Sequence, residues 1–477
     1  MKLISCAIVV LVLFVTVATS ADIFLEWHVI TINGLFPGPL INATTNDDIH
    51  VNVFNDLDEP LLFTWNGIQQ RLNSWQDGVS GTNCPIQPAT NWTYNFEFKD
   101  QIGTFFYFPS INFLKAGGGF GPIRVNNRAV ISVPFPKPEA EFDLLIGQSY
   151  SVLVTANQNA ADYYIVASPK LSNATNNNTL VGISVLHYDN STTQANGPLP
   201  SGPDPFDLEF SINQAKSIRW NLTAGAARPN PQGTFNVTNV TISQTFILEA
   251  STTTIDRLSR YTVNNVSYLT PDTPLKLADH FSNGSGVYQL DAYSKNTSNV
   301  KAVRDVFVAS ALHKEWAEIV VQNTLTTIDS WHLDGYSFFV VGLGEGEWKE
   351  ESRSSYNRFD PIVRSTVQVF PGGWSAVYVF PDNPGMWNLR SQNLQSWYLG
   401  EELYVRVYDP DPNPAKERPP PQNLLLCGKY QPSTPPPSVS PPPPPPNVPS
   451  SKAYNPHTRS LIAMMTTAMC FLYIGFH

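Results

Sequence analysis

The chain has little charge and lacks the local motifs of the common enzyme sites. Asp, Glu, Lys and Arg make up 14% of its 477 residues, and the net charge is −10. Without a long Lys/Arg run, a nucleic-acid or anionic-lipid partner is not expected. No Gly-x-Ser-x-Gly or His-Glu-x-x-His motif is present. "GLGEGEW" (Gly342–Trp348) has no phosphate-binding lysine or helix signal beside it, so a nucleotide site is not indicated.

Histidine and cysteine are also sparse, and none of them cluster. No two histidines lie within five residues, so the sequence contains no His-x-His or His-x3-His pair. A blue-copper centre needs a Cys thiolate and two histidines, and no cysteine here has a nearby histidine. The histidines are His28, His50, His187, His280, His313, His332, His457 and His477.

What the chain does contain is material for strands and turns. Aromatic residues reach 12%, with 41 prolines and 28 glycines, a mixture typical of many short strands. Apolar and polar residues alternate in Ile49–Leu57 and Trp92–Asp100, and strand-like runs follow at Gly103–Ser110 and Gly121–Asn127. We expect an antiparallel β-sandwich over residues 21–133.

Two further strand-rich regions follow, over residues 134–200 and 206–428. The second of the three spans only about 55 residues between its linkers, against about 100 for a complete sandwich. The third has clear strands in Trp316–Asn323 and Thr366–Phe380. Within it, "IDSWHLDGYSFFVVG" (Ile328–Gly342) has the pattern of a metal-binding hairpin with one histidine.

Both ends of the chain have the pattern of processing signals. Residues 1–20 combine Lys2, the apolar run Ile8–Val17 and small residues at a cleavage site, which predicts a secretory signal rather than a membrane anchor. Residues 429–451 form a Pro-rich stalk of expected polyproline II structure. Ser450 or Ser451, a polar spacer and the apolar end predict a GPI-attachment signal over 452–477. The alternative, a membrane helix, needs about 20 apolar residues.

Processing would leave two cysteines and a surface with many sequons. Cys6 and Cys470 leave with the two signals, whereas Cys84 and Cys427 remain and can pair in one way within the chain. In a secreted protein, Asn-x-Ser/Thr sequons predict N-glycosylation. They begin at Asn42, Asn91, Asn173, Asn177, Asn190, Asn221, Asn236, Asn239, Asn265, Asn283 and Asn296.

Several motifs resemble one protein family. They include "INGLFPGPLINAT" (Ile32–Thr44), "TWNGIQQRLNSWQDGVSGTNCPI" (Thr64–Ile86), "DQIGTFFYFPS" (Asp100–Ser110), "WHLDGYSFFVVG" and "GMWNLRSQNLQSWYLGEELYVRV" (Gly385–Val407). The chain resembles the plant multicopper-oxidase superfamily of ascorbate oxidase and laccase, and within it the skewed-growth-type monocopper oxidase-like branch. The resemblance implies an all-β fold of tandem cupredoxin-like, Greek-key domains. It also implies that any copper lies in the last domain and at its interface with the first.

The residues that bind copper in active members of this family are almost all replaced. "TWNG" stands where relatives have His-Trp-His-Gly, and a single histidine of the expected ligands, His332, is retained. Arg390, Ser391 and Gln392 replace the His-Cys-His triplet. By resemblance, the positions that have lost a ligand are Thr64, Asn66, Phe108, Ser110, Asp329, Asp334, Arg390, Ser391, Gln392, Ser396 and Glu401.

The resemblance has consequences for the other candidate residues. It implies a disulfide between Cys84 and Cys427, which leaves no thiolate for copper. We predict no catalytic residue, and we name His332 with Asp329 and Asp334 as a weak metal candidate, although 329 would face away from 332 and 334 in a strand. We interpret "WQDG" (Trp75–Gly78) as a turn and packing feature.

One junction departs from the family pattern. "VPFPKPEAEFD" (Val133–Asp143) runs directly into "LLIGQSYSVLVT" (Leu144–Thr155), where relatives have most of the middle domain. We therefore expect domain 2 to be truncated, through a flawed gene model or a splice variant.

The resemblance implies a GPI-anchored glycoprotein on the outer surface of the plasma membrane and in the plant cell wall. We predict a non-catalytic protein with no cofactor, or at most one weakly bound copper, acting in wall organisation and directional cell expansion. The expected partners are the GPI lipid in the outer leaflet and wall polymers or glycoproteins. Two alternatives stay open: a copper-dependent oxidoreductase of small phenols or ascorbate with a nonstandard single-copper site, and a structural wall glycoprotein dominated by its stalk.

Overall fold

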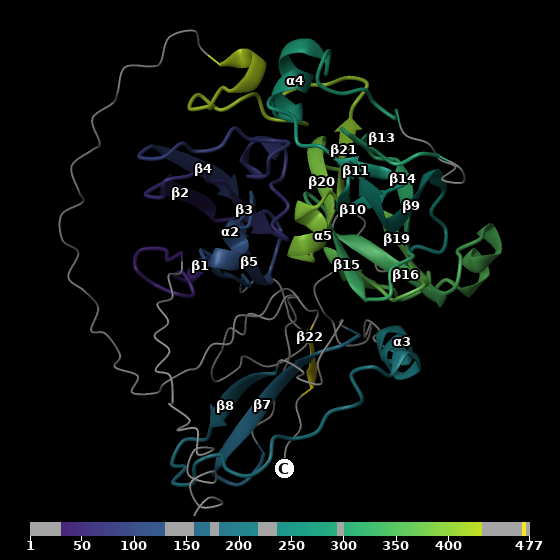
Figure 1. Cartoon of the computed structure of the whole chain (residues 1–477). Coiled ribbons are helices and arrows are strands. Elements are labelled where there is room, and N and C mark those ends of the chain that lie inside the picture. The colour runs from purple at the N-terminus through teal and green to yellow at the C-terminus, as the bar shows by residue number, and fades with distance from the viewer. Residues whose placement is uncertain are drawn as a thin grey trace, which may run out of the picture.

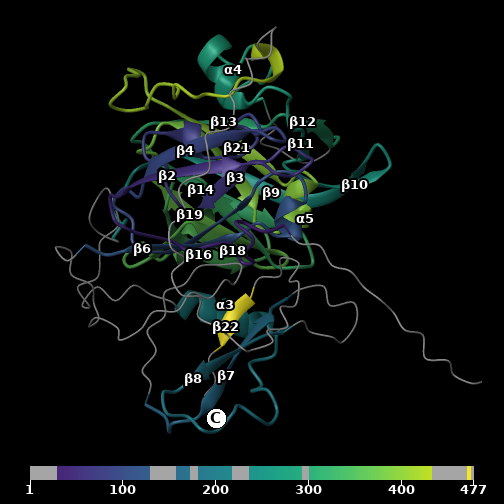
Figure 2. The same ribbon diagram turned by 90° about the vertical axis from the view of Figure 1, so that its left-hand side faces the viewer.

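The computed structural model describes residues 30–128, 157–171, 181–217, 236–292 and 300–431, together with the backbone of one strand at 470–473. Figures 1 and 2 show a first and a third strand-rich region side by side, with a smaller middle region beneath them. The signal segment 1–20, the stalk beyond residue 431 and Ser450 and Ser451 lie outside the described residues, as do sequons Asn173, Asn177, Asn221 and Asn296.

The first region is a β-sandwich in which aromatic residues alternate inward. Its strand pairs are antiparallel except that of Ile41–Thr44 with Gly121–Asn126, which is parallel, so the antiparallel expectation is wrong at this pair. Trp92, Tyr94 and Phe96 on β4 are buried while their neighbours are not, and Trp65 packs edge-to-face against Tyr94 with ring centroids 5.1 Å apart. Its sheets have the orders β1-β6-β5-β3 and β2-β4. The elements are β1 (Ile41–Thr44), β2 (Asp48–Phe54), β3 (Phe63–Asn66), the 3-10 turn η1 (Ser74–Gln76), β4 (Asn91–Glu97), β5 (Gly103–Pro109), α2 (Leu114–Gly117) and β6 (Gly121–Asn126).

The middle region is small among the described residues. Strands β7 (Asp162–Pro169) and β8 (Gly182–His187) are antiparallel, and β22 (Cys470–Tyr473) pairs with the other edge of β7. Helix α3 (Leu208–Ser217) leads toward the third region. Ile183 and Val185 on β8 are 53% and 47% exposed, so this sheet has an apolar face in contact with solvent.

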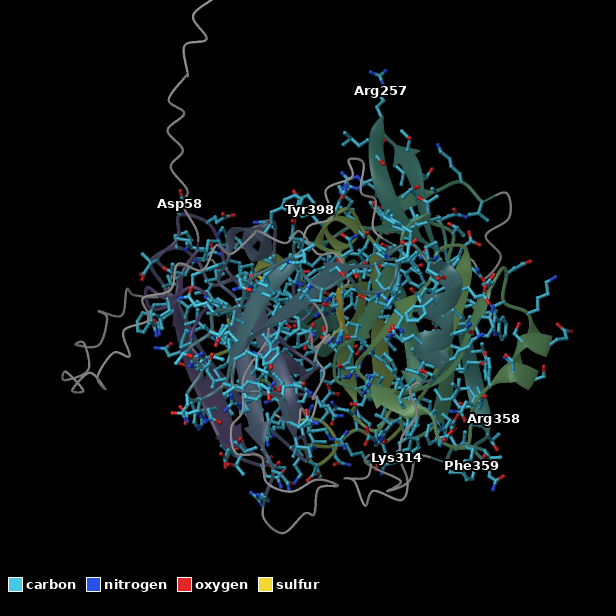
Figure 3. The ribbon with its side chains drawn as sticks, turned by 90° about the horizontal axis from the view of Figure 1, so that it is seen from below. Asp58, Arg257, Lys314, Arg358, Phe359 and Tyr398 are labelled. Carbon is cyan, nitrogen blue, oxygen red and sulfur yellow. A yellow bond between two sulfur atoms is a disulfide. The ribbon has the colours of Figure 1, made fainter. Side chains whose placement is uncertain are left out.

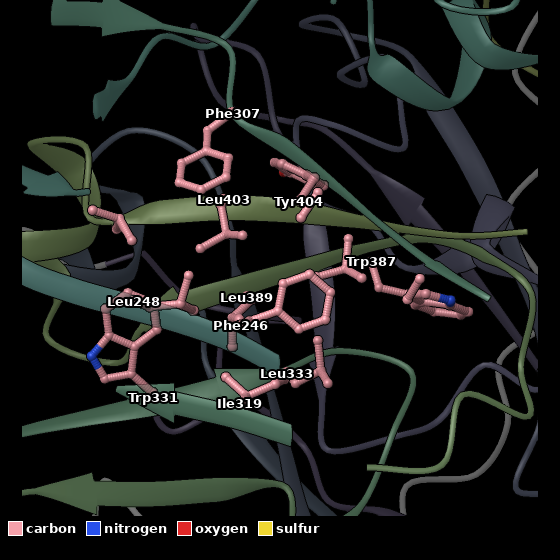
Figure 4. Close-up of a cluster of buried hydrophobic side chains, with 14 of the residues drawn as sticks. Phe246, Leu248, Phe307, Ile319, Trp331, Leu333, Trp387, Leu389, Leu403 and Tyr404 are labelled. Carbon is pink, nitrogen blue, oxygen red and sulfur yellow. The ribbon is translucent and has the colours of Figure 1, made fainter. Parts of the chain in front are cut away.

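The third region is a two-sheet sandwich with a large core. Its sheets have the orders β12-β11-β10-β9-β14-β19-β16-β17 and β13-β21-β20-β15-β18. Figure 4 shows Phe246 and Leu248 of one sheet facing Leu333, Leu389 and Leu403 of the other. The strands are β9 (Ile242–Ile255), β10 (Leu258–Val263), β11 (Val266–Tyr268), β12 (Val303–Asp305), β13 (Val308–Leu312), β14 (Trp316–Asn323), β15 (Asp329–Leu333), β16 (Phe338–Glu345), β17 (Ile362–Arg364), β18 (Thr366–Val369), β19 (Gly373–Val379), β20 (Gly385–Ser391) and β21 (Glu402–Tyr408). The helices are α4 (Leu275–Ser282), η3 (Glu350–Ser355), α5 (Leu394–Tyr398) and η4 (Gly428–Tyr430).

The expected hairpin at Ile328–Gly342 is wrong. Strand β15 pairs with β18 and β20, whereas β16 pairs with β17 and β19 in the opposite sheet. The turn at Gly335 has φ +79°, and a Cβ there would lie 2.4 Å from the Trp387 ring. Strand β15 is wholly buried, and β16 is buried mainly in its first half. Because the two strands pair within different sheets, the turn between them crosses from one layer of the core to the other.

The first and third regions are held together by covalent and polar contacts. The disulfide Cys84–Cys427 is present and joins residues 343 positions apart, which confirms the expected pairing. Arg71 donates two hydrogen bonds of 2.7 Å to the carboxylate of Asp382. Close packing requires glycine at position 81, since a Cβ there would lie 2.3 Å from the Tyr404 ring.

One hairpin extends from the body of the third region. Figure 3 shows Arg257 at the tip of the β9–β10 hairpin. Asp256 and Arg257 both have positive φ, 52° and 64°, as a two-residue type I′ turn requires. The described residues include no helix with the length and apolarity that crossing a membrane takes.

Candidate functional site

The positions at which the resemblance implies a lost copper ligand lie at the interface of the first and third regions and in the adjoining part of the third region. Strand pairing sets Thr64 opposite Phe108 in the first region and His332 opposite Arg390 in the third. All eleven of these side chains are buried. Eight of them form two groups, which we name the arginine cluster (Asn66, Asp334, Arg390 and Gln392) and the carboxyl cluster (Asp329, Ser391, Ser396 and Glu401).

The arginine cluster is centred on the fully buried guanidinium of Arg390. Its Nη1 forms an ion pair with Asp334 and donates a 2.8 Å hydrogen bond to Asn388 Oδ1. Its Nη2 reaches Asn66 Oδ1 of the first region at 3.4 Å, and Gln392 Nε2 donates to the same oxygen at 3.1 Å. The guanidinium carbon lies 4.7 Å from the Trp397 ring centroid. The Arg390 charge is therefore paired and stacked at the boundary between the two regions.

His332 is tied into the same cluster through both ring nitrogens. Its Nε2 lies 2.9 Å from Asp334 Oδ1, and its Nδ1 lies 3.0 Å from Thr366 Oγ1. Because a carboxylate only accepts, Nε2 donates and Nδ1 accepts from the threonine hydroxyl. Burial lowers the pKa of His332, against the opposing effect of Asp334, so the ring is neutral. Neither nitrogen has a lone pair left for a metal.

Arg390 stabilises the charge of Asp334, whereas burial and the Asp334 charge keep Asp77 protonated. Burial alone would raise the pKa of Asp334, but Arg390 and His332 hold it below its usual value. Burial raises the pKa of Asp77 well above its usual value, and the Asp334 charge raises it further. Asp334 is therefore the counter-ion of Arg390, and Asp77 is the neutral carboxyl beside it.

Lys115 of α2 lies at the first-region side of this cluster. Its Nζ is 3.9 Å from the ring centroid of Phe108 and 5.7 Å from that of Phe106. Burial lowers its pKa to about 7, and the charge of Arg390 adds to this effect. A lysine that is half neutral near pH 7 thus faces the ring that stands at a former ligand position.

The carboxyl cluster contains Asp329, Ser391, Ser396 and Glu401. Ser391 Oγ donates a 2.7 Å hydrogen bond to Asp329 Oδ1, as does the Ser330 backbone N–H. Burial raises the pKa of Asp329 to about 6. Burial, and then the charge of Asp329, raises the pKa of Glu401 well above its usual value. These side chains stand where the resemblance places the type 1 copper ligands.

The three residues of the weak metal candidate do not come together. His332 and Asp334 are hydrogen-bonded, but Asp329 bonds to Ser391 and Ser330 in the other cluster. Within the described part of the chain, no group of three or more His, Cys, Asp or Glu is placed to hold a metal ion. Since copper needs imidazole or thiolate ligands to cycle between oxidation states, the residues present do not fit the copper centres of the family.

Sequence reasoning missed several members of these clusters. Asp77, interpreted as part of a turn, is buried beside Asp334, and Lys115, Asn388 and Trp397 all contact or act on the arginine cluster. The sequence did contain one signal for these residues. Charged residues are few in this chain, and Asp77 and Arg390 each stand in an otherwise uncharged segment, so a burial of either would require a charged or hydrogen-bonding partner.

The remaining former ligand positions have local roles. Ser110 Oγ donates to Gly78 O at 2.5 Å, Phe108 packs with Leu394 and Trp397, and the Thr64 hydroxyl has no hydrogen-bond partner among the described residues. Of the sequons in the described ranges, Asn265 is half-buried and the others are exposed, namely Asn42, Asn91, Asn190, Asn236, Asn239 and Asn283.

Comparison with known proteins identifies the family. Residues 16–130, 136–191 and 272–413 each match a family model described as multicopper oxidase. The chain is 41% identical to the "Monocopper oxidase-like protein SKU5" of Arabidopsis thaliana, over 87% of this chain and 88% of that one. It is 35% identical to an "L-ascorbate oxidase homolog" of Brassica napus, over 87% and 91%.

Solved structures agree on the fold. The laccase from Botrytis aclada superposes with a TM-score of 0.55 at 18% identity, covering 79% of this chain and 83% of that one. The alignment with the Arabidopsis relative is 520 residues long, more than the 477 of this chain, so that relative has segments without a counterpart here. The chain belongs to the multicopper oxidase family, in its skewed-growth-type, monocopper oxidase-like branch.

Proposed function

We propose that this protein is a cell-surface glycoprotein of the multicopper oxidase family that acts without redox catalysis, in plant cell-wall organisation and directional cell expansion. The observation that supports it most is the arginine cluster. Arg390 and Asp334 form a buried ion pair where copper ligands stand in active relatives, and both nitrogens of His332 are engaged. A copper ion at this interface would have to displace a cation that already has its counter-ion.

The sulfur chemistry supports the same conclusion. A type 1 copper needs a thiolate, and Ser391 stands at that position, hydrogen-bonded to Asp329. Cys84 and Cys427 are consumed by their disulfide. We propose that the protein has no resident redox cofactor and binds at most one copper, weakly.

The proposed location follows from the two ends of the chain. The secretory signal, the GPI-attachment signal at Ser450 or Ser451 and the Pro-rich stalk would place the globular part outside the plasma membrane, on the GPI lipid. Wall polymers or glycoproteins are the proposed partners. Release of the protein from plant membranes by phosphatidylinositol-specific phospholipase C tests the anchor, and retention after treatment would refute it.

Oxygen consumption tests the absence of catalysis. The purified secreted protein, supplied with Cu²⁺ and then freed of unbound metal, is mixed with ascorbate or a small phenol. We expect no oxygen uptake above a copper-free blank. Sustained uptake that is lost in a His332→Ala variant would establish the alternative, an oxidoreductase with a nonstandard single-copper site.

A stalk deletion separates the proposed role from a purely structural one. If the globular part acts, a version without the Pro-rich stalk but with its anchor signal restores directional growth in plants that lack the protein. Failure to restore growth at normal surface abundance would favour a wall glycoprotein in which the stalk is the main feature.

We also propose that the middle domain is truncated. The junction of Asp143 with Leu144 and the excess length of the alignment with the Arabidopsis relative support this. Sequencing transcripts across these two codons tests it: a flawed gene model predicts additional coding sequence between them, and a splice variant predicts both forms.

A further inference from the structure

The carboxyl cluster brings four oxygen-bearing side chains together from separate elements. Asp329 begins β15, Ser391 ends β20, Ser396 lies in α5 and Glu401 directly precedes β21. Backbone bonds fix their spacing: Ser391 N donates to Glu401 O at 3.1 Å, and Glu401 N donates to Ser396 O at 2.9 Å. Their exposed fractions are 3%, 0%, 2% and 0%. A cluster built from four elements is fixed by the fold and not by one loop.

Three carboxyl oxygens in this cluster have no hydrogen-bond partner. They are Asp329 Oδ2 and both side-chain oxygens of Glu401, and each has almost no contact with solvent. The Ser396 hydroxyl and the Trp331 indole favour the charged forms of the two acids, but neither reaches hydrogen-bond geometry. Unpartnered buried carboxyl oxygens are costly, so the cluster lacks a ligand for them.

The described residues supply no counter-charge for these two acids. Neither Asp329 nor Glu401 forms an ion pair there, and Arg390, adjacent in sequence to Ser391, is directed to Asp334. Burial raises the pKa of the half-buried Tyr261 of β10, and the charges of Glu401 and Asp329 raise it further. This titratable neighbour of the two acids is therefore an acidic group that supplies no positive charge.

We propose that Asp329, Ser391, Ser396 and Glu401 bind one hard divalent cation, with Ca²⁺ as the best match. Carboxylate and hydroxyl oxygens are ligands for Ca²⁺, Mg²⁺ and Mn²⁺, whereas copper cycling needs nitrogen or sulfur donors. Calcium accepts irregular oxygen shells and bidentate carboxylates; magnesium requires a near-ideal octahedron and keeps several waters. A fully buried pair of acids with two hydroxyls fits the first requirement better. The former type 1 copper position thus becomes an oxygen-donor cation site.

Terbium luminescence and calorimetry test this site directly. The full secreted protein is freed of metal with a chelator and titrated with CaCl2, and separately with Tb³⁺, whose emission the adjacent Trp331 would sensitise. We expect one Ca²⁺ per chain, a melting temperature that rises with Ca²⁺ concentration, and displacement of Tb³⁺ by Ca²⁺. Absence of saturable binding of either ion would overturn the proposal.

Variants distinguish this cluster from the neighbouring buried acid Glu402. Glu401→Gln and Asp329→Asn are expected to weaken Ca²⁺ binding at least tenfold. Glu402→Gln is the matched control, because the neighbouring acid is also buried but accepts from Asn388 instead, and it should leave affinity within twofold. Ser396→Ala removes one hydroxyl at little risk to folding and should weaken binding several-fold.

Equal affinity in all four variants would place the ion elsewhere and refute the proposal. If the wild-type protein does not bind Ca²⁺ and Glu401→Gln is more stable than the wild type, the proposal is refuted. That result would show that Asp329 and Glu401 share a proton instead.

Discussion

Replacing Arg390 with Met would leave Asp334 buried without its counter-ion. The ion pair, the 2.8 Å hydrogen bond to Asn388 and the stacking on Trp397 would all be lost. Breaking a buried pair from one side costs about 3–5 kcal/mol. The cation–π contact with Trp397 accounts for about 1–2 kcal/mol of this loss. The Met side chain offsets part of the loss, because it fills much of the space that the Arg390 side chain occupied. We therefore expect the free energy of unfolding to fall by about 3–5 kcal/mol.

Urea denaturation followed by tryptophan fluorescence measures this loss. Asp334→Asn keeps an acceptor for His332 while it removes the stranded charge, so the double variant Arg390→Met, Asp334→Asn should be more stable than Arg390→Met alone. Lys99→Met is the surface control, because its pairs with Glu97 and Asp100 are 3.8 Å long and partly exposed; the expected cost is about 0–1 kcal/mol. A loss below about 1 kcal/mol for Arg390→Met would refute the buried ion pair.

Three further predictions concern other parts of the molecule. Cys84→Ser should lower the free energy of unfolding by about 2–5 kcal/mol, and a reducing agent that lowers the melting temperature of the wild type should leave that of this variant unchanged. Acylation of Lys115 should show half-titration near pH 7, whereas Lys99 serves as the exposed comparison; modification of Lys115 only at strongly alkaline pH would contradict the burial effect. Because the pKa of Lys115 is lower in the folded chain than in the unfolded one, its contribution to stability should rise as pH rises from about 7 to about 10.5, and Lys115→Met should flatten that rise. Enzymatic removal of N-glycans should reduce the mass of the secreted protein, and Asn91→Gln should remove one glycan, since this exposed sequon begins β4; an unchanged mass would show that the site is not used.

The sequence was sufficient for some strands of the first and third regions, including β4 and β14, and for the disulfide. Period-2 alternation in Trp92–Asp100 predicts β4 because alternate residues of a strand face the same side. With the two predicted terminal signals set aside, only Cys84 and Cys427 remain, so one pairing within the chain was possible. The replacement of the copper ligands stays a prediction that rests on comparison of short motifs with the family pattern.

The side chains that contact the substituted residues in the folded protein could not be identified from the sequence. Arg390 and Asp334 are far apart along the chain, and the β15–β20 register brings them together. That register depends on which strands share a sheet, and the local pattern misassigned this point when it predicted a hairpin for β15 and β16. Asp77 was missed for a similar reason, because its turn is buried only when the first and third regions meet.

The separation of Asp329 from His332 could be anticipated in part. Strand alternation places residue 329 on the opposite face from 332 and 334, and the structure places its carboxyl with Ser391. The orphan oxygens of Glu401 could not be inferred, because a buried carboxyl has no sequence signature apart from its partners.

The copper content of the secreted protein tests the central claim most directly. The full chain is purified without refolding, dialysed against a weak chelator and measured by elemental mass spectrometry, with copper expressed per mole of protein. The arginine cluster predicts a ratio near zero, unchanged in a His332→Ala variant. A ratio near one in the wild type that falls in this variant would contradict the account and restore a copper-dependent function.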